Sequence, residues 1–165
     1  MVKRVLHYVG QMDIGGIESL LMSIYRNINK SEYQFDFAVH TQKKCFYDDE
    51  IEDLGGTFYR FPMMRKDPRK YRDAWDDFWD KHKNDYIAFH FHTPTFANII
   101  AMISAKKYGV PVIIAHCHNI HPNKGRWQLI HDIIHKYHGK HIERYADVFC
   151  ACSEDAAKWG FGKQY

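Results

Sequence analysis

Two adjacent glycines near the start of the chain have the pattern of an anion-binding turn. Gly15 and Gly16 follow a short apolar run, Val5–Val9, and precede an amphipathic segment. Glycines between a strand and a helix let backbone N–H groups approach a ligand, with the positive end of the helix dipole behind them. The spacing matches neither G-x-G-x-x-G nor a P-loop, and a plain tight turn also needs glycine. The turn therefore predicts contact with an anionic group, most often a phosphate.

Pairs of histidines end two other candidate strands. His90 and His92 lie two residues apart at the end of one apolar run. His116 and His118 repeat this spacing at the end of the next. Alternation along a strand puts both members of a pair on one face. The later member of each pair is nearer the strand end, so we expect His92 and His118 to be exposed to a ligand crevice. We expect the earlier members, and His7, to pack between sheet and helices with hydrogen bonds to the backbone.

The elements that would position these residues alternate between strand and helix. The runs with the character of strands are Val5–Val9, Phe35–Val39, Thr57–Phe61, Tyr86–His92, Val112–His116 and Val148–Cys152. Such alternation predicts a doubly wound, mainly parallel Rossmann-like α/β sheet of about six strands in the order 3-2-1-4-5-6, with helices on both faces. Ligands bind such sheets beyond the carboxyl ends of the strands, where the strand order reverses. The glycine turn and the two later histidines would meet there.

Large apolar residues at helical spacing predict the connecting helices and the faces that they bury. There are four such stripes: Ile17, Leu20, Leu21, Ile24 and Ile28; Tyr71, Trp75, Phe78, Trp79 and His82; Phe96, Ile99, Ile100 and Ile103; and Trp127, Ile130, Ile134, Tyr137 and His141. A shorter helix is expected over Asp48–Leu54. Burial of the fourth stripe would turn the histidines between its members toward solvent.

Composition narrows the class of protein. The 165 residues suffice for one domain with a full core, and 45% of them are hydrophobic. The net charge of +3 is too small to predict a nucleic-acid partner. The chain has neither a signal-peptide pattern nor an apolar run of membrane length, which predicts a cytoplasmic protein. The four cysteines lack C-x-x-C spacing, so we expect free, buried thiols.

The segments that end the strands resemble the N-terminal half of family 4 glycosyltransferases, which have the GT-B fold. The resemblance covers essentially the whole chain. It is carried by Gly15-Gly-Ile-Glu18, His90-Phe-His-Thr-Pro94, Ala115-His-Cys-His-Asn119 and Ala146-Asp-Val-Phe-Cys-Ala-Cys-Ser-Glu154. It implies that residues 1–165 form a single acceptor-side domain, one half of a GT-B fold, and that the C-terminal nucleotide-sugar-binding domain is absent from this chain.

The resemblance also implies a reaction. A retaining, hexosyltransferase-type enzyme would move a sugar from a nucleotide-sugar donor to a glycan or lipid-linked acceptor, in polysaccharide or glycolipid biosynthesis for the cell envelope. No cofactor or metal is expected, because the nucleotide-sugar is a substrate. Gly15 and Gly16 would approach the donor phosphates, and His118 would be the catalytic residue near the reacting sugar. The candidate acceptor-binding residues are Glu18, His92, Thr93, Asn119, Ser153 and Glu154. The isolated chain is expected to be inactive.

A basic segment raises the question of location. Its cations are Arg65, Lys66, Arg69, Lys70 and Arg72, which lie beside two methionines. A solvated loop is one interpretation. The other is a patch on anionic headgroups, where each basic residue contributes ~1 kcal/mol. Membrane-associated members of the resembled family hold lipid-linked acceptors in this way, so the protein is expected to be cytoplasmic with possible peripheral contact at the inner membrane face.

Two other functions stay open from the sequence. His131-Asp-Ile-Ile-His135, with His138 one turn further on, mimics the H-E-x-x-H motif of zinc hydrolases. Aspartate is one methylene shorter than the usual base, however, and the fourth stripe would leave these histidines in solvent. The histidine pairs at the strand ends could also gather a metal. The remaining alternative is a stand-alone nucleotide- or carbohydrate-binding module.

Overall fold

The predicted alternation of strands and helices is present. The structure, a computed structural model, describes residues 2–118 and 128–162. Its strands are β1 (Lys3–Tyr8), β2 (Tyr33–Val39), β3 (Phe58–Arg60), β4 (Tyr86–Thr93), β5 (Val112–Cys117) and β6 (Val148–Ala151). All pairs of described strands are parallel, and their order is β3-β2-β1-β4-β5-β6. The predicted fold class and strand order are therefore confirmed.

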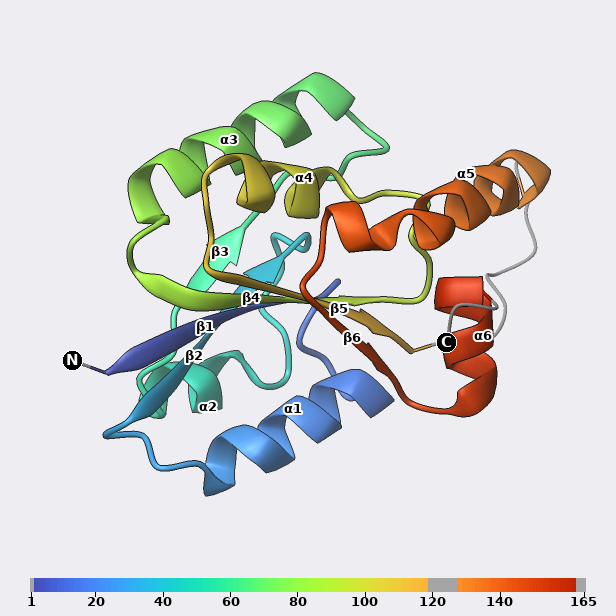
Figure 1. Cartoon of the computed structure of the whole chain (residues 1–165). Coiled ribbons are helices and arrows are strands. Elements are labelled where there is room, and N and C mark those ends of the chain that lie inside the picture. Colours follow the sequence, from blue (N-terminus) through green and yellow to red (C-terminus); the bar gives the residue numbers. More distant parts are fainter. Residues whose placement is uncertain (1, 119–127, 163–165) are drawn as a thin grey trace.

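Helices cover both faces of this sheet. They are α1 (Gly16–Asn27), α2 (Asp48–Asp53), α3 (Pro68–His82), α4 (Ile100–Lys107), α5 (Gln128–Lys140) and α6 (Glu154–Phe161), with a 3₁₀ turn at Ile142–Arg144. Figure 1 shows α1 and α2 on one face and α3, α4 and α5 on the other. The sheet is thus the middle layer of three, which is why most of its strands have few polar positions.

Each face of the sheet has its own hydrophobic core. The core under α3 and α4 is the larger, and its centre is aromatic: the ring of Phe61 stacks on that of Trp75 with centroids 3.8 Å apart. The core under α1 and α2 includes Met22 and Phe37. Asp67 caps α3 by accepting a hydrogen bond from the Lys70 N–H at 2.9 Å. This cap fixes where α3 begins, within the basic segment.

A buried carboxylate joins four segments on the α3 face. Asp36, on β2, accepts hydrogen bonds from the guanidinium of Arg4 at 2.5 and 2.7 Å and from the hydroxyl of Tyr86 at 2.9 Å. The N–H of Thr57, in the turn before β3, donates to the same carboxylate at 2.7 Å. A buried charge persists only when it is paired and hydrogen-bonded. Asp36 therefore ties β1, β2, β4 and the turn before β3 together.

The faces that the helices bury match the predicted stripes in part. In α3, Tyr71, Trp75, Phe78 and Trp79 are buried as predicted, and His82 is half-buried. In the third stripe, Phe96 and Ile99 are buried as predicted, whereas Ile103 is exposed. In α1, Met22 and Tyr25 are buried while Leu20 and Ile24 are exposed. The buried residues of α4 are small or flexible, namely Ala101, Met102, Ser104 and Ala105. Small side chains allow α4 to lie close against α3 and the sheet, a requirement that apolar spacing does not reveal.

The largest departure is in α5, where the predicted buried face is the exposed one. Tyr137 is 57% exposed, and His135 is completely buried. The reason is hydrogen bonding: the N–H of Phe96 donates to Nδ1 of His135 at 2.9 Å, and the other ring nitrogen donates to the carbonyl of Trp159 at 2.9 Å. Nδ1 of His138 donates to the carbonyl of Phe96 at 2.6 Å. These backbone groups require polar partners, so the histidines face inward.

The thiols also differ in part from expectation. Cys45 and Cys117 are buried as predicted, Cys150 is half-buried and Cys152 is exposed. All four are free, as the spacing predicted.

Candidate functional site

The predicted site residues collect at one edge of the sheet. Because the strands are parallel, the segments that follow β1, β4, β5 and β6 all start at their carboxyl ends. The glycine turn follows β1, His118 follows β5, and Ser153 follows β6. The strand order reverses between β1 and β4, where a crevice is expected in this class of sheet.

The glycine turn leaves the start of α1 open. Gly15 is the N-cap, in an extended conformation with φ of −160°, and Gly16 is the first helical residue. No side chain caps this end, and within residues 2–118 and 128–162 no hydrogen bond is formed by the N–H of Gly15, Gly16 or Ile17. A Cβ added to Gly16 would meet only open space. The first turn of α1 can therefore accept an anion at its amides.

One acidic side chain already lies at this helix end. A Cβ added to Gly15 would collide with the carboxylate of Glu18, which folds back from the first turn of α1. The helix dipole favours a negative group there. A phosphate that bound these amides would have to displace the Glu18 carboxylate, so this residue competes with a bound anion.

Five imidazoles form a cluster on the α1 face of the sheet, toward the carboxyl ends of β1, β4 and β5. The register places His7 opposite His90, and His92 opposite His116. Three rings form a hydrogen-bonded chain, in which Nδ1 of His7 lies 3.1 Å from Nε2 of His92 and Nδ1 of His92 lies 2.9 Å from Nε2 of His118. The other two rings form a separate pair, with Nε2 of His90 at 3.1 Å from Nδ1 of His116. Packing of β1, β4 and β5 thus brings together every histidine that the sequence placed on these strands.

The expected exposure of His92 is wrong. Its side chain is only 4% exposed, because the rings of His7, His90, His116 and His118 surround it. The predicted burial of His7 is confirmed, but its ring bonds another imidazole rather than the backbone. Half-buried His118 is the outer end of the chain. Its backbone N–H donates to the carbonyl of Thr93 at 3.1 Å, which fixes its place beside the end of β4.

The cluster is uncharged near neutral pH. Burial lowers the pKa of His7 and of His92 well below the ordinary value, and nearby imidazoles lower both further. Burial, assisted by neighbouring imidazoles, lowers the pKa of His90 to about 3 and that of His118 to about 4. Burial also lowers the pKa of His116. A protonated imidazole in this group would lose hydration and would repel any second protonated ring.

Neutral imidazoles can bind metals as well as hydrogen-bond to one another. Two sets of rings have nitrogens within 4.8 Å of each other: His7, His90 and His92, and then His92, His116 and His118. A metal at either set would have to replace an imidazole–imidazole hydrogen bond of 2.9–3.1 Å. The H-E-x-x-H-like helix is a poorer metal site, because backbone groups bond both ring nitrogens of His135.

The remaining predicted residues lie around the same edge, with side chains partly committed to the fold. The hydroxyl of buried Thr93 donates to the carbonyl of Thr95 at 2.7 Å. The hydroxyl of Ser153 caps α6 by accepting from the N–H of Ala156 at 3.1 Å, and Glu154 is exposed in the first turn of α6. Asn119 lies outside the described residues.

The basic segment borders a hollow that the sequence did not indicate. Its five cations, Arg65, Lys66, Arg69, Lys70 and Arg72, are all exposed. Two of them, Lys66 and Lys70, line a hollow of ≈ 700 Å³ together with Lys43, Arg60 and His40. Lys43 and His40 come from the segment after β2, far from the basic segment in sequence, so no local pattern identifies this hollow.

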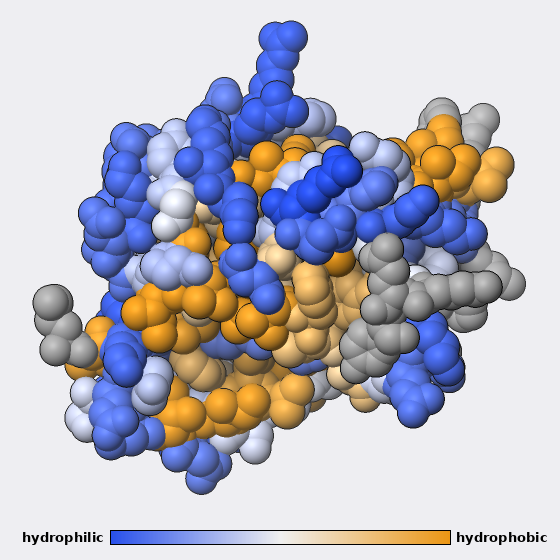
Figure 2. All heavy atoms as spheres, viewed as in Figure 1, coloured by the Kyte–Doolittle hydropathy of each residue, from blue (hydrophilic) through white to orange (hydrophobic). Residues whose placement is uncertain are grey.

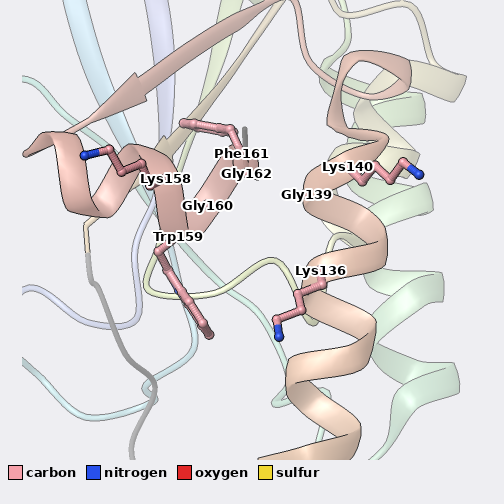
Figure 3. Close-up of a pocket in the computed structure, with 8 residues that line it drawn as sticks. All are labelled: Lys136, Gly139, Lys140, Lys158, Trp159, Gly160, Phe161 and Gly162. Carbon is pink, nitrogen blue, oxygen red and sulfur yellow. The ribbon is translucent and has the colours of Figure 1, made fainter. Parts of the chain in front are cut away.

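A second hollow, of ≈ 600 Å³, lies between α5 and α6. Figure 3 shows Lys136 and Trp159 pointing into the space between the two helices. Its lining contains none of the predicted site residues. Gly139 permits the close approach of the helices, because a Cβ there would collide with the carbonyl oxygen of Gly160.

The fold and this edge define a Rossmann-like α/β domain with an open helix N-terminus and a neutral histidine cluster at the carboxyl side of the same sheet. A solved short-chain dehydrogenase/reductase of Burkholderia vietnamiensis matches it with a TM-score of 0.54, covering 92% of this chain and 84% of that chain at 9% identity. That likeness shows the fold alone.

Sequence comparison identifies the family. The model of Glycosyltransferase Family 4 matches residues 14–160. "Putative glycosyltransferase EpsF" of Bacillus subtilis (strain 168) is 35% identical over 171 aligned residues, which cover 98% of this chain. The chain belongs to glycosyltransferase family 4, as its resemblance predicted. It spans 41% of the length of that relative.

The lowered pKa values predict how stability depends on pH. Above pH 7 the histidines are neutral in both states, so the cluster contributes no pH dependence. Below pH 6.5 the unfolded chain binds protons that the folded cluster rejects, so the free energy of unfolding falls as pH falls from 6.5 to 5. Each such imidazole contributes up to ~1.4 kcal/mol per pH unit.

Urea unfolding at several pH values should show that the free energy of unfolding of His92→Phe changes less steeply with pH. An unchanged slope would contradict the prediction, and His131→Gln, on the exposed side of α5, is the control.

Proposed function

We propose that this chain is the acceptor-side half of a retaining glycosyltransferase that moves a hexose from a nucleotide-sugar to a glycan or lipid-linked acceptor. The observation that supports this most is that the open first turn of α1 and His118 both lie at the carboxyl edge of the sheet, where the strand order reverses between β1 and β4. Family membership gives the reaction class, and the geometry offers a role to each group.

The chemistry suits these groups. Breaking the bond between sugar and phosphate builds negative charge on the leaving diphosphate. Fixed N–H dipoles at Gly16 and Ile17 would stabilise that charge without reorganising during the reaction. His118 would hold a hydroxyl of the sugar or acceptor in place, and its neutral ring would not compete with the amides for the diphosphate. We assign no metal or other cofactor to this reaction.

Acceptor contacts would come from the same edge. Glu18, His92, Thr93, Asn119, Ser153 and Glu154 are the residues that we assign to acceptor or substrate binding. Buried His92 would act through His118, and Thr93 through its turn, while Glu18 and Glu154 could bond sugar hydroxyls directly. We further propose that the product is a polysaccharide or glycolipid of the cell envelope.

The first test compares the activity of the 165 residues with that of the complete polypeptide that contains them. We expect the complete polypeptide that contains these residues to release nucleoside diphosphate from a UDP-, GDP- or ADP-hexose in the presence of a sugar acceptor. The 165 residues alone should show no transfer, because we assign donor binding to a region outside them. Product analysis by mass spectrometry measures both. Transfer by the isolated chain would contradict the assignment, as would the absence of transfer by the complete polypeptide with every donor.

Two substitutions in the complete polypeptide then test the roles. His118→Ala should lower kcat at least tenfold. Gly16→Ala should raise the donor KM severalfold, because its Cβ would occupy space open to the phosphates but touch nothing within 4 Å in this chain. Circular dichroism should show both variants folded. Lys81→Ala, which removes an exposed ion pair with Asp77, is the matched control with unchanged kinetics. Near-normal turnover by His118→Ala would reduce this residue to packing.

We also propose that the acceptor edge sits on an anionic membrane surface. No described helix has the length and apolar character to cross a bilayer. Arg65, Lys66, Arg69, Lys70 and Arg72 are exposed and form no ion pair with any described residue, which leaves their charge for headgroups.

An apolar helix face lies at the same edge. Large apolar side chains of α5 are exposed, namely Leu129, Ile130, Ile133, Ile134 and Tyr137. Figure 2 shows an orange area at the upper right, where α5 lies in the same view of Figure 1. The basic segment spans the start of α3, which follows β3, and α5 follows β5, so both lie at helix starts on the carboxyl edge of the sheet. Cations beside exposed apolar residues are typical of interfacial helices.

Vesicle flotation tests this contact. We expect the chain to float with vesicles that contain anionic phosphatidylglycerol but not with neutral phosphatidylcholine, and to be released by high salt. A combined Arg69→Gln and Lys70→Gln variant should lose most of the binding, and Ile133→Gln should weaken it. Lys81→Gln, on the far part of α3, is the control. A lack of flotation at low salt would end the proposal.

A further inference from the structure

We propose that His7 and His92 are positioning residues that lock His118 in one tautomer. In this tautomer Nδ1 of His118 is bare, that is, unprotonated, and accepts a hydrogen bond from a sugar hydroxyl. The lock itself needs only the histidine chain, whereas the hydroxyl partner rests on the proposed function.

The numbers of donors and acceptors on the three rings restrict their tautomers. A neutral imidazole carries one N–H and one bare nitrogen. Both nitrogens of His92 are used, one toward His118 at 2.9 Å and one toward His7 at 3.1 Å. If Nε2 of His92 donates to His7, its Nδ1 must accept from Nε2 of His118. If the proton is on Nδ1 instead, both bonds reverse. The three rings therefore adopt the same tautomer, and the tautomer of His118 is set by its hydrogen bond to His92.

The buried end of the chain decides between the two directions. Nε2 of His7 is buried and has no hydrogen-bond partner among the described residues. Its surroundings are aromatic: the ring of Phe35 lies 4.2 Å from that of His7, and the ring of Phe37 5.7 Å, between centroids. An N–H keeps a weak attraction to the negative faces of such rings, whereas a bare nitrogen is repelled by them. The favoured chain has Nε2–H on all three rings, which leaves Nδ1 of His118 bare.

The hydrogen-bonded series of His7, His92 and His118 orients the ring of His118 and does not store a proton. A proton passed inward would make an imidazolium at His92 or His7, both buried, and no carboxylate bonds either ring in residues 2–118 and 128–162. The lowered pKa values of both rings agree with this. Nδ1 of His118 has no partner among the described residues, so it is the atom left for a ligand. A bare nitrogen of a neutral ring accepts from hydroxyls and does not attract phosphate, which assigns it to the sugar.

The separate histidine pair supplies a matched control. The side chains of His90 and His116 form a hydrogen bond to one another at 3.1 Å and none to His7, His92 or His118. The ring of His90 nevertheless packs against that of His92, with centroids 3.9 Å apart. Replacing His90 with Phe should therefore keep the packing and leave the tautomer of His118 unchanged.

Nitrogen-15 NMR of histidine-labelled chain at pH 7 tests the lock, because protonated and bare ring nitrogens resonate far apart. We expect His7, His92 and His118 to show Nε2–H and bare Nδ1. In His92→Phe, His118 should become a mixture of tautomers. In His92→Asn, the side-chain carbonyl can accept from Nε2 of His118 and should restore the original signal. His118 with Nδ1–H in the unmodified chain, or unchanged signals in His92→Phe, would overturn the proposal.

Two further measurements complete the test. Elemental analysis of untagged protein should show no stoichiometric metal, because a metal at these rings would replace the hydrogen bonds and sink the proposal. In the complete polypeptide, kcat should fall about tenfold for His92→Phe and recover partly for His92→Asn, with the donor KM unchanged. If NMR shows the lock but no variant or parent transfers sugar, the proposed function fails alone. If transfer occurs without the lock, the positioning role fails alone.

Discussion

The parallel register of β1, β4 and β5 is the constraint on which the site depends. It sets His7 opposite His90 and His92 opposite His116, so that imidazoles from three strands share one face. The same direction of the strands brings the start of α1 and the residue after β5 to a common edge. A shift of one residue in β4 would move its histidines to the face packed by α3 and remove the cluster from the edge.

Burying five imidazoles is acceptable because they satisfy one another. Each polar ring would be costly alone in a sheet face, but donor and acceptor nitrogens meet at 2.9–3.1 Å. The cluster remains uncharged, as burial lowers every one of its pKa values. Beside this neutral cluster, the open end of α1 offers backbone N–H groups to an anion. An anionic leaving group and a neutral sugar can be recognised by different neighbours, which suits a reaction that separates the two.

The comparisons place this arrangement in context. A dehydrogenase with 9% identity has a similar fold, so the sheet by itself does not select a reaction. What distinguishes this chain is the set of residues at the carboxyl edge, within the region matched by glycosyltransferase family 4. The relative from Bacillus subtilis is 35% identical and is more than twice as long, since this chain spans 41% of it.

The sequence by itself determined the strands, their parallel order and the position of the glycine turn, because these follow from local alternation and from the backbone freedom of glycine. It also determined the buried face of α3, because large aromatic residues lie along only one face of this helix. The tertiary structure decided the rest. The inner face of α5 is set by backbone groups of Phe96 and Trp159, which come from other elements and need the ring of His135. The burial of His92 likewise depends on neighbours from β1 and β5, and hydrogen bonds between distant segments leave no periodic trace in a sequence.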